Sequence, residues 1–158
     1  MEVLVNRISR ANAPSGHQPE RVPVIEDDGL VRLDPWWGSI QPGQLHSDLP
    51  TWGELELIDH IESGGRLIDT RQPAYVEASG TIPGAIVLPW ETIAEHLDLF
   101  DARRVTALFC NGPQCAATPR AVERLLAVGV APASLAYYRG GIQDWVALGL
   151  PTVPVSSK

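Results

Sequence analysis

From residue 51 onward, short apolar segments alternate with segments whose apolar residues recur at helical spacing. This alternation constrains the fold more than any other feature of the sequence. The segment 105–109 (VTALF) contains almost no polar residue, which indicates a strand covered on both faces. Strands separated by helices predict an α/β fold, with a parallel sheet, helices on both faces, and ligands at the carboxyl ends of the strands. The other expected strands are 66–69, 84–88 and 135–138. One expected helix runs from a cap at Thr51 to the glycine pair at 64–65, and the others are 92–99, 119–128 and 142–148.

Particular residues predict where two of these helices begin and end. Thr51, with Glu54 three residues later, forms the pattern of a capping box, and the glycine pair at 64–65 is typical of a helix C-terminus. Thr118, followed by Pro119, has the pattern of an N-cap and a first helical position.

The N-terminal third of the chain has several turn-forming residues and little helical periodicity. An Asp-Gly pair lies between short apolar runs at 22–25 and 30–33 and predicts a β-hairpin. We expect a further strand at 3–8, and we expect Trp36 and Trp37 to cover the main core rather than to form a binding platform. The predicted division is an extension rich in short strands at 1–49, a main domain at 50–154 and a frayed tail at 155–158.

Charge and cysteine content exclude several classes of function. With 12 Lys and Arg against 19 Asp and Glu, the net charge is −7, which argues against nucleic acid or an anionic membrane as partner. Two cysteines are too few for a disulfide scaffold, and the scattered histidines predict no metal site and no cofactor. No stretch approaches the roughly 18 apolar residues of a membrane span, so we expect a cytoplasmic location.

One predicted loop carries reactive chemistry. Cys110 follows the apolar strand, and the sequence CNGPQC then leads directly into a helix. A strand–loop–helix junction directs backbone N–H groups and the positive end of a helix dipole toward one point. A thiol at that point is expected to have a lowered pKa and to act as a nucleophile. The alternative is that Cys110 is only a small buried residue closing a core strand.

Four segments in register resemble the rhodanese-like sulfurtransferases. The segment 67–71 (LIDTR) resembles the family's strand and its Asp-x-Arg, and 79–85 (SGTIPGA) resembles a family turn. Cys110 stands where the family's persulfide-forming cysteine belongs, and 135–145 (LAYYRGGIQDW), followed by Gly149-x-Pro, resembles the C-terminal motif. The resemblance covers about residues 51–154 and implies a rhodanese-like fold.

The resemblance implies a sulfurtransferase that takes a sulfane sulfur from thiosulfate or another small donor onto Cys110. The persulfide then passes the sulfur to a thiol or other thiophilic acceptor, which could be a protein thiol. Asp69 and Arg71 are expected to support the active loop rather than to touch substrate. The loop that would cradle the anion consists of Asn111, Gly112, Pro113, Gln114, Cys115 and Ala116.

Two positions depart from the family pattern. Thr81 replaces a usual histidine, which is normally structural, and Cys115 stands where many single-domain members carry an arginine. The missing cation weakens the case for dianionic thiosulfate as donor, although Arg120 or Arg139 could compensate. Cys115 is also a candidate resolving thiol, able to attack a Cys110 persulfide, or it is only a small residue at the helix entrance.

Three functions therefore remain open at this level. Sulfur transfer is favoured over a non-enzymatic rhodanese-like interaction or regulatory module, because such modules often lack the loop cysteine that this chain keeps. A cysteine-based phosphatase would need a C-x5-R loop to clamp phosphoryl oxygens, and this spacing places Ala116 at the arginine position.

Overall fold

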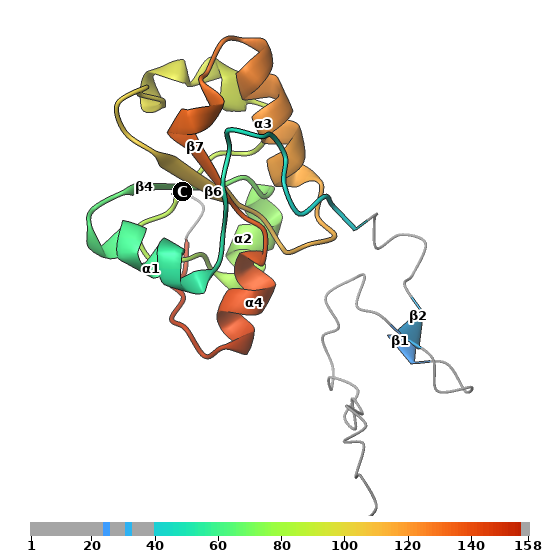
Figure 1. The fold of residues 1–158 in the computed structure, drawn as a ribbon. Coiled ribbons are helices and arrows are strands. Elements are labelled where there is room, and N and C mark those ends of the chain that lie inside the picture. Colours follow the sequence, from blue (N-terminus) through green and yellow to red (C-terminus); the bar gives the residue numbers. More distant parts are fainter. Residues whose placement is uncertain (1–23, 26–30, 33–39, 156–158) are drawn as a thin grey trace, which may run out of the picture. The chain divides into compact units, whose positions relative to one another are not determined.

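The structure is a computed structural model that describes residues 24–25, 31–32 and 40–155. The chain divides into two compact units, Met1–Gly38 and Ser39–Lys158. In the first unit, β1 (Val24–Ile25) pairs antiparallel with β2 (Val31–Arg32), as the hairpin prediction requires (Figure 1). The expected strand at 3–8, the two tryptophans at 36 and 37, and the tail from residue 156 lie outside the described residues.

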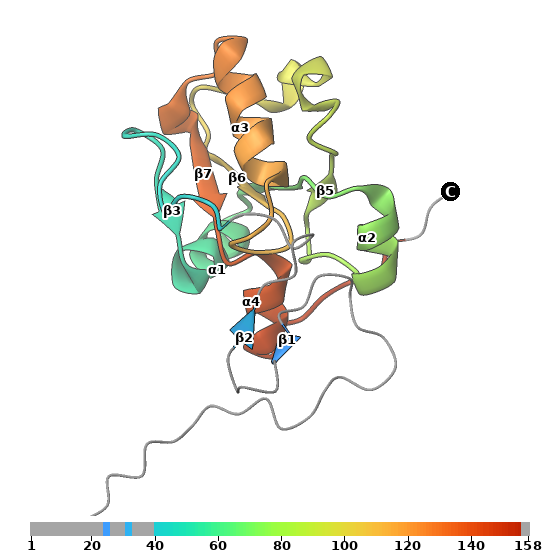
Figure 2. The ribbon, with the colours of Figure 1, turned by 90° about the vertical axis from the view of Figure 1, so that its right-hand side faces the viewer.

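The second unit is built on a five-stranded sheet in which every pair of neighbouring strands is parallel. The strand order is β3-β7-β6-β4-β5, so β6 lies at the centre. In Figure 2 the labelled strands β3, β7, β6 and β5 follow one another from left to right. All four residues of β6 are buried, because the sheet is covered on both faces. The predicted α/β fold class is therefore confirmed. The strands are β3 (Thr51–Trp52), β4 (Arg66–Asp69), β5 (Ile86–Val87), β6 (Thr106–Phe109) and β7 (Leu135–Tyr138).

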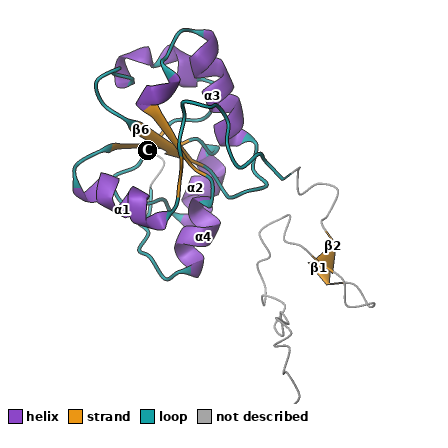
Figure 3. Ribbon diagram, viewed as in Figure 1, coloured by secondary structure: helices purple, strands orange, loops and turns teal. Residues whose placement is uncertain are grey.

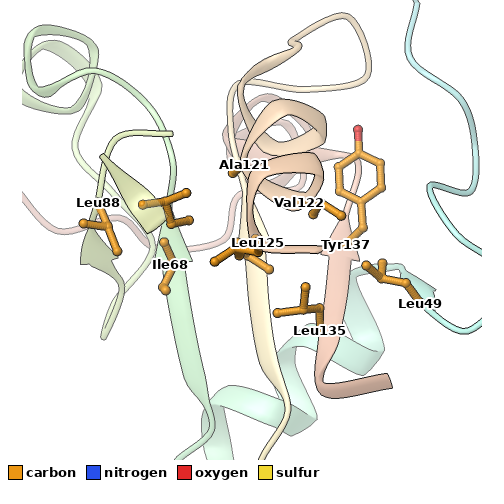
Figure 4. Packing of buried hydrophobic residues seen from close by; sticks show 10 residues of the cluster. Leu49, Ile68, Leu88, Ala121, Val122, Leu125, Leu135 and Tyr137 are labelled. Carbon is orange, nitrogen blue, oxygen red and sulfur yellow. The ribbon is translucent and has the colours of Figure 1, made fainter. Parts of the chain in front are cut away.

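Helices cover both faces of the sheet, as Figures 1 and 3 show. On one face, α3 packs Ala121, Val122 and Leu125 against strand residues such as Ile68 and Leu135 (Figure 4). On the other face, Phe109 belongs to a cluster with side chains of α1 and α4. Complete burial of one large apolar side chain stabilises the fold by about 1.5–3 kcal/mol. The four α-helices are α1 (Glu54–Glu62), α2 (Pro73–Ser79), α3 (Ala117–Ala127) and α4 (Gly141–Ala147).

Two predicted helix caps are wrong, because tertiary contacts take the capping side chains. Thr51 belongs to β3, which pairs with β7, and its hydroxyl donates to the Gly43 carbonyl. The N-cap of α1 is Gly53, whose N–H donates to Glu56 Oε2 at 3.2 Å. Thr118 lies inside α3, with its hydroxyl 2.9 Å from the hydroxyl of Thr70, the residue that follows β4.

Other elements differ in length or type from the predictions. The segment expected as one helix at 92–99 forms two separate 3-10 turns, Ile93–Glu95 and Leu97–Leu99. The sequence interpretation also missed β3 and α2. Gly64 has a φ of 76°, in agreement with the predicted end of the preceding helix. Within the described ranges, every helix is too short or too polar to serve as a membrane span.

Candidate active site

Cys110 lies at the carboxyl end of β6, between the ends of the neighbouring strands β4 and β7. Its side chain is buried, with 1% of the residue exposed, and the loop that follows leads into α3. Because β6 is central, segments from both neighbouring strands can reach the loop. The predicted loop residues therefore surround the carboxyl edge of the sheet.

Thr70 joins the three elements at this edge. Its backbone N–H and its hydroxyl both donate to the Phe109 carbonyl at 3.0 Å, and the hydroxyl lies 2.9 Å from Thr118 Oγ1. The residue before Cys110 is thus held to β4 and to the first turn of α3. Sequence reasoning missed this role, although Thr70 stands between the two residues singled out in the LIDTR segment.

The N-terminus of α4 holds the first two carbonyls of the loop. The N–H groups of Ile142 and Gln143 donate to the carbonyls of Cys110 and Asn111, each at 2.9 Å. This contact requires glycine at 141, where φ is 64° and an added Cβ would lie 2.4 Å from the Cys110 carbonyl oxygen. Because these carbonyls point toward α4, the loop can turn its N–H groups toward the sulfur atoms.

A segment before β3 crosses the other side of the loop. The Gln41 N–H donates to the Pro113 carbonyl at 2.7 Å. Arg139, which follows β7, donates from Nη2 to the Gln41 carbonyl at 2.7 Å and from Nε to the Pro42 carbonyl at 3.2 Å. The proline of the loop is therefore tied to the chain upstream of the sheet.

The two arginines considered as substitutes for a loop cation have other partners. Arg139 holds the two carbonyls of the crossing segment. Arg120 stacks on the Trp90 ring, with its guanidinium carbon 5.0 Å from the ring centroid. Neither contact includes a sulfur atom.

The two cysteine side chains lie against each other inside the loop. A turn in which the Cys115 N–H donates to the Gly112 carbonyl at 2.9 Å brings the sixth loop residue back toward the first. The Cys110 thiol donates to the Cys115 carbonyl oxygen at 3.5 Å, and it also lies within hydrogen-bond reach of the Cys115 sulfur, which is the acceptor. Both cysteines are free thiols. The described residues include no group of three or more His, Cys, Asp and Glu side chains placed to hold a metal ion.

The N–H groups of the loop divide between the two sulfur atoms. The N–H groups of Asn111 and Ala117 hydrogen-bond the Cys115 sulfur, whereas the N–H and hydroxyl of Thr118 act on Cys110. The Cys115 side chain thus points into the cradle rather than outward, although it is only half-buried. In this position the Cys115 sulfur accepts hydrogen bonds from two backbone N–H groups that the sequence analysis expected to bind an anion on Cys110.

The acidity of Cys110 is opposite to the sequence prediction, and the lowered pKa belongs to Cys115. Burial raises the pKa of Cys110 well above its usual value, and the neighbouring Cys115 raises it further. The hydrogen bond from Cys110, together with those from the loop N–H groups and the charge of Arg71, lowers the pKa of Cys115 to about 6. The prediction of a lowered pKa for Cys110 is therefore wrong, because complete desolvation outweighs the local donors. Of the two thiols, Cys115 is therefore the one that ionises first, with the Cys110 proton directed toward its sulfur.

Asp69 and Arg71 form a buried ion pair with a 2.7 Å contact between Arg71 Nη2 and Asp69 Oδ2. Arg71 also donates to Ser79 Oγ and to the Gly80 carbonyl, each at 2.7 Å. Thr81, at the position of the family histidine, donates its hydroxyl to Asp69 at 2.7 Å. The hydrogen bonds of this pair thus hold the turn after α2, and Arg71 influences the active loop through its charge.

Tyr137 is a residue of the site that sequence reasoning missed. Its side chain is completely buried, and its hydroxyl has no hydrogen-bond partner among residues 40–155. Burial raises the pKa of Tyr137, and the nearby Cys110 and Cys115 raise it further. Figure 4 shows the ring pointing away from Leu135, toward the carboxyl end of β7. Strand alternation could have found it, because Tyr137 pairs with Leu108 and so shares a face with Cys110.

A family model and several solved structures match the chain. The model of the rhodanese-like domain matches residues 54–148. A rhodanese-related protein from Thermoplasma volcanium has a TM-score of 0.52 at 20% identity, with 66% of this chain and 97% of that chain covered. A thiosulfate sulfurtransferase from Pseudomonas aeruginosa has a TM-score of 0.55 at 21% identity, with 70% of this chain and 21% of that chain covered.

A further solved structure carries a different description. A protein of unknown function from Rhodopseudomonas palustris, described as a possible tyrosine phosphatase, has a TM-score of 0.57 at 21% identity. The match covers 69% of this chain and 88% of that chain. No curated protein matches the chain. At these identities the solved structures show a shared fold and do not assign an activity.

Proposed function

Since the chain belongs to the rhodanese-like domain family, we propose that it is a sulfurtransferase that carries a sulfane sulfur as a persulfide on Cys110. The observation that carries the proposal is the buried Cys110 thiol beside the Cys115 thiolate, in a loop whose N–H groups bind both sulfur atoms. A persulfide is an anion, and inward-pointing N–H groups at a helix N-terminus stabilise anions.

The hydrogen bond from Cys110 to the Cys115 sulfur gives Cys110 a route to its reactive form despite its burial. As Cys110 attacks the sulfane sulfur of a donor, its proton passes to the adjacent Cys115 thiolate. With thiosulfate as donor, the bond between the two sulfur atoms of thiosulfate breaks, a bond from Cys110 to the sulfane sulfur forms, and sulfite leaves with the bonding pair. The products are a Cys110 persulfide anion, a neutral Cys115 thiol and sulfite. A thiophilic acceptor, such as a small or protein thiol, then takes the outer sulfur.

Tyr137 supports an anion at this place. A buried hydroxyl without a partner costs about 1–3 kcal/mol, and a hydrogen bond to a charged group contributes about 1.5–3 kcal/mol. The Tyr137 hydroxyl is buried, lacks a partner among the described residues, and is electrostatically coupled to both sulfur atoms. The outer sulfur of a persulfide would give this hydroxyl the acceptor that it lacks.

Phosphoryl transfer is less well supported, in spite of the description of one structural neighbour. The loop from Cys110 to Ala116 contains no arginine, so no guanidinium of the loop can clamp phosphoryl oxygens. A non-enzymatic interaction module is the remaining alternative, and it predicts that the loop thiol is inert.

Intact-protein mass spectrometry after incubation with thiosulfate, and separately with inorganic polysulfide, tests the proposal. We expect the protein to gain one sulfur atom per chain and Cys110→Ser to gain none, because a serine hydroxyl cannot form a persulfide. Thermal unfolding of Cys110→Ser shows whether the variant remains folded. Sulfur gain by Cys110→Ser would overturn the assignment. A wild type that neither gains sulfur nor forms a Cys110–Cys115 disulfide with any sulfane donor would also overturn it, and such inertness would favour the interaction module. Hydrolysis of p-nitrophenyl phosphate would favour the phosphatase.

A further inference from the structure

The position of Cys115 inside the active loop is not explained by sulfur transfer through Cys110 alone. A transient carrier needs one thiol and an anion cradle, yet here a second thiol occupies part of the cradle. The turn from Gly112 to Cys115 directs this side chain inward, and the Cys110 and Cys115 thiols are in hydrogen-bond contact. A second thiol so close to a persulfide is positioned to react with it.

We propose that Cys115 is a resolving thiol, which attacks the inner sulfur of the Cys110 persulfide, forms a Cys110–Cys115 disulfide and releases hydrosulfide. The domain would thereby reduce sulfane sulfur to sulfide, in addition to transferring it. This inference rests on the proposed persulfide of Cys110 and extends the chemistry of that same loop.

The step balances without an external oxidant. The proton on Cys115 first moves to the outer sulfur, so that the reacting pair is a neutral hydropersulfide and a Cys115 thiolate. The new bond joins the two cysteine sulfur atoms, and the bond from Cys110 to the outer sulfur breaks. The outer sulfur leaves as hydrosulfide with the bonding electrons. Two thiols are oxidised to a disulfide, and one sulfane sulfur is reduced by two electrons to sulfide.

The environment of the two thiols favours attack on the inner rather than the outer sulfur. Attack on the outer sulfur would expel the Cys110 thiolate, and burial makes this thiolate a poor leaving group by raising its pKa. Attack on the inner sulfur expels hydrosulfide, which is more acidic than an ordinary thiol. A lower pKa of the leaving group speeds exchange, so the difference between the sites directs the reaction toward a disulfide.

The partial exposure of Cys115 also allows the proposed disulfide to be reduced again. Cys110 is buried, whereas Cys115 is half-buried and therefore accessible in part from solvent. An external dithiol reductant can reach the Cys115 side of the disulfide and supply the two electrons that restore both thiols. The complete cycle therefore consumes one sulfane sulfur and one dithiol, and releases one sulfide.

The test compares wild type with Cys115→Ser and Cys115→Ala, each treated without oxygen with a small excess of inorganic polysulfide and then separated from it. Released sulfide is followed over time, and alkylated peptides are mapped by mass spectrometry. We expect the wild type to release one sulfide per chain as one intramolecular disulfide forms, and dithiothreitol to restore two alkylatable thiols. Both variants lack the Cys115 base and should load more slowly, so each is loaded fully before the comparison begins. Once loaded, both should keep the persulfide on Cys110 at least tenfold longer and release no sulfide.

The outcomes separate this inference from the proposed function. A wild-type persulfide that lasts as long as that of the variants, with no disulfide, would overturn the resolving role and leave the sulfur carrier intact. Sulfur found on Cys115 would also overturn it, because that product requires attack on the outer sulfur. If the wild type gains no sulfur and forms no disulfide, the proposed function fails and this inference fails with it. The one-to-one relation of sulfide to disulfide in the wild type is decisive even if a variant folds poorly.

Discussion

Replacement of Gly141 by alanine should damage both the stability of the domain and its active loop. Gly141 begins α4 with a φ of 64°, a conformation that costs a residue with a side chain about 1–2 kcal/mol. An added Cβ would lie 2.4 Å from the Cys110 carbonyl oxygen and 2.7 Å from both the Asn111 carbonyl carbon and the Gly112 nitrogen. All three atoms belong to the backbone, so none can move aside as a flexible side chain would.

The expected loss of stability follows from these two terms. Forcing extra volume into a packed site costs about 1–3 kcal/mol, which adds to the conformational cost and gives a total of about 2–5 kcal/mol. Gly149→Ala is the matched control, because Gly149 has a φ of 76° and no atom within 4 Å of the added Cβ. This control should lose only the conformational cost of about 1–2 kcal/mol.

Urea unfolding measures the free energies, and sulfur loading by mass spectrometry reports on the loop. Gly141→Ala should also weaken the hydrogen bonds from α4 to the Cys110 and Asn111 carbonyls and slow sulfur loading at least tenfold. Gly149→Ala should load at the wild-type rate. If the two variants lose equal stability and load equally fast, α4 does not shape the active loop as the geometry indicates.

Two further predictions concern the electrostatics of the same site. Tyr137→Phe removes a buried hydroxyl without a described partner, so the unfolding free energy of the unloaded protein should stay the same or rise. The same change should shorten the lifetime of the persulfide about tenfold, because the outer sulfur loses a hydrogen-bond donor. An unchanged lifetime would show that the hydroxyl does not bind the outer sulfur. Alkylation of Cys115 by iodoacetamide should rise with pH through a midpoint near 6, because only the thiolate reacts. Cys110→Ala should move that midpoint to higher pH, because it removes the principal hydrogen-bond donor to the Cys115 sulfur. Cys110→Ser keeps a donor and should move the midpoint less. Equal midpoints in the two variants would contradict the role of that donor.

Local sequence pattern was sufficient for the fold class. The strands at 66–69 and 135–138 have the predicted bounds, because short segments with apolar centres between turn residues and helices are too short for a helix and suit a buried strand. Helix caps were less predictable. Thr51 and Thr118 have side chains suited to capping, but a strand pairing and a contact with Thr70 take them. Local propensity could not reveal these competing long-range partners.

For the site, the sequence located a cysteine at the end of a central strand, before a loop and a helix. Only the tertiary structure decided which thiol of the pair has the lower pKa. Acidity depends on burial and on the direction of individual N–H groups, and these follow from packing against α4 and from the turn that directs Cys115 inward. The Tyr137 hydroxyl was likewise invisible to local patterns, because its place beside the sulfur atoms arises from the pairing of β6 with β7.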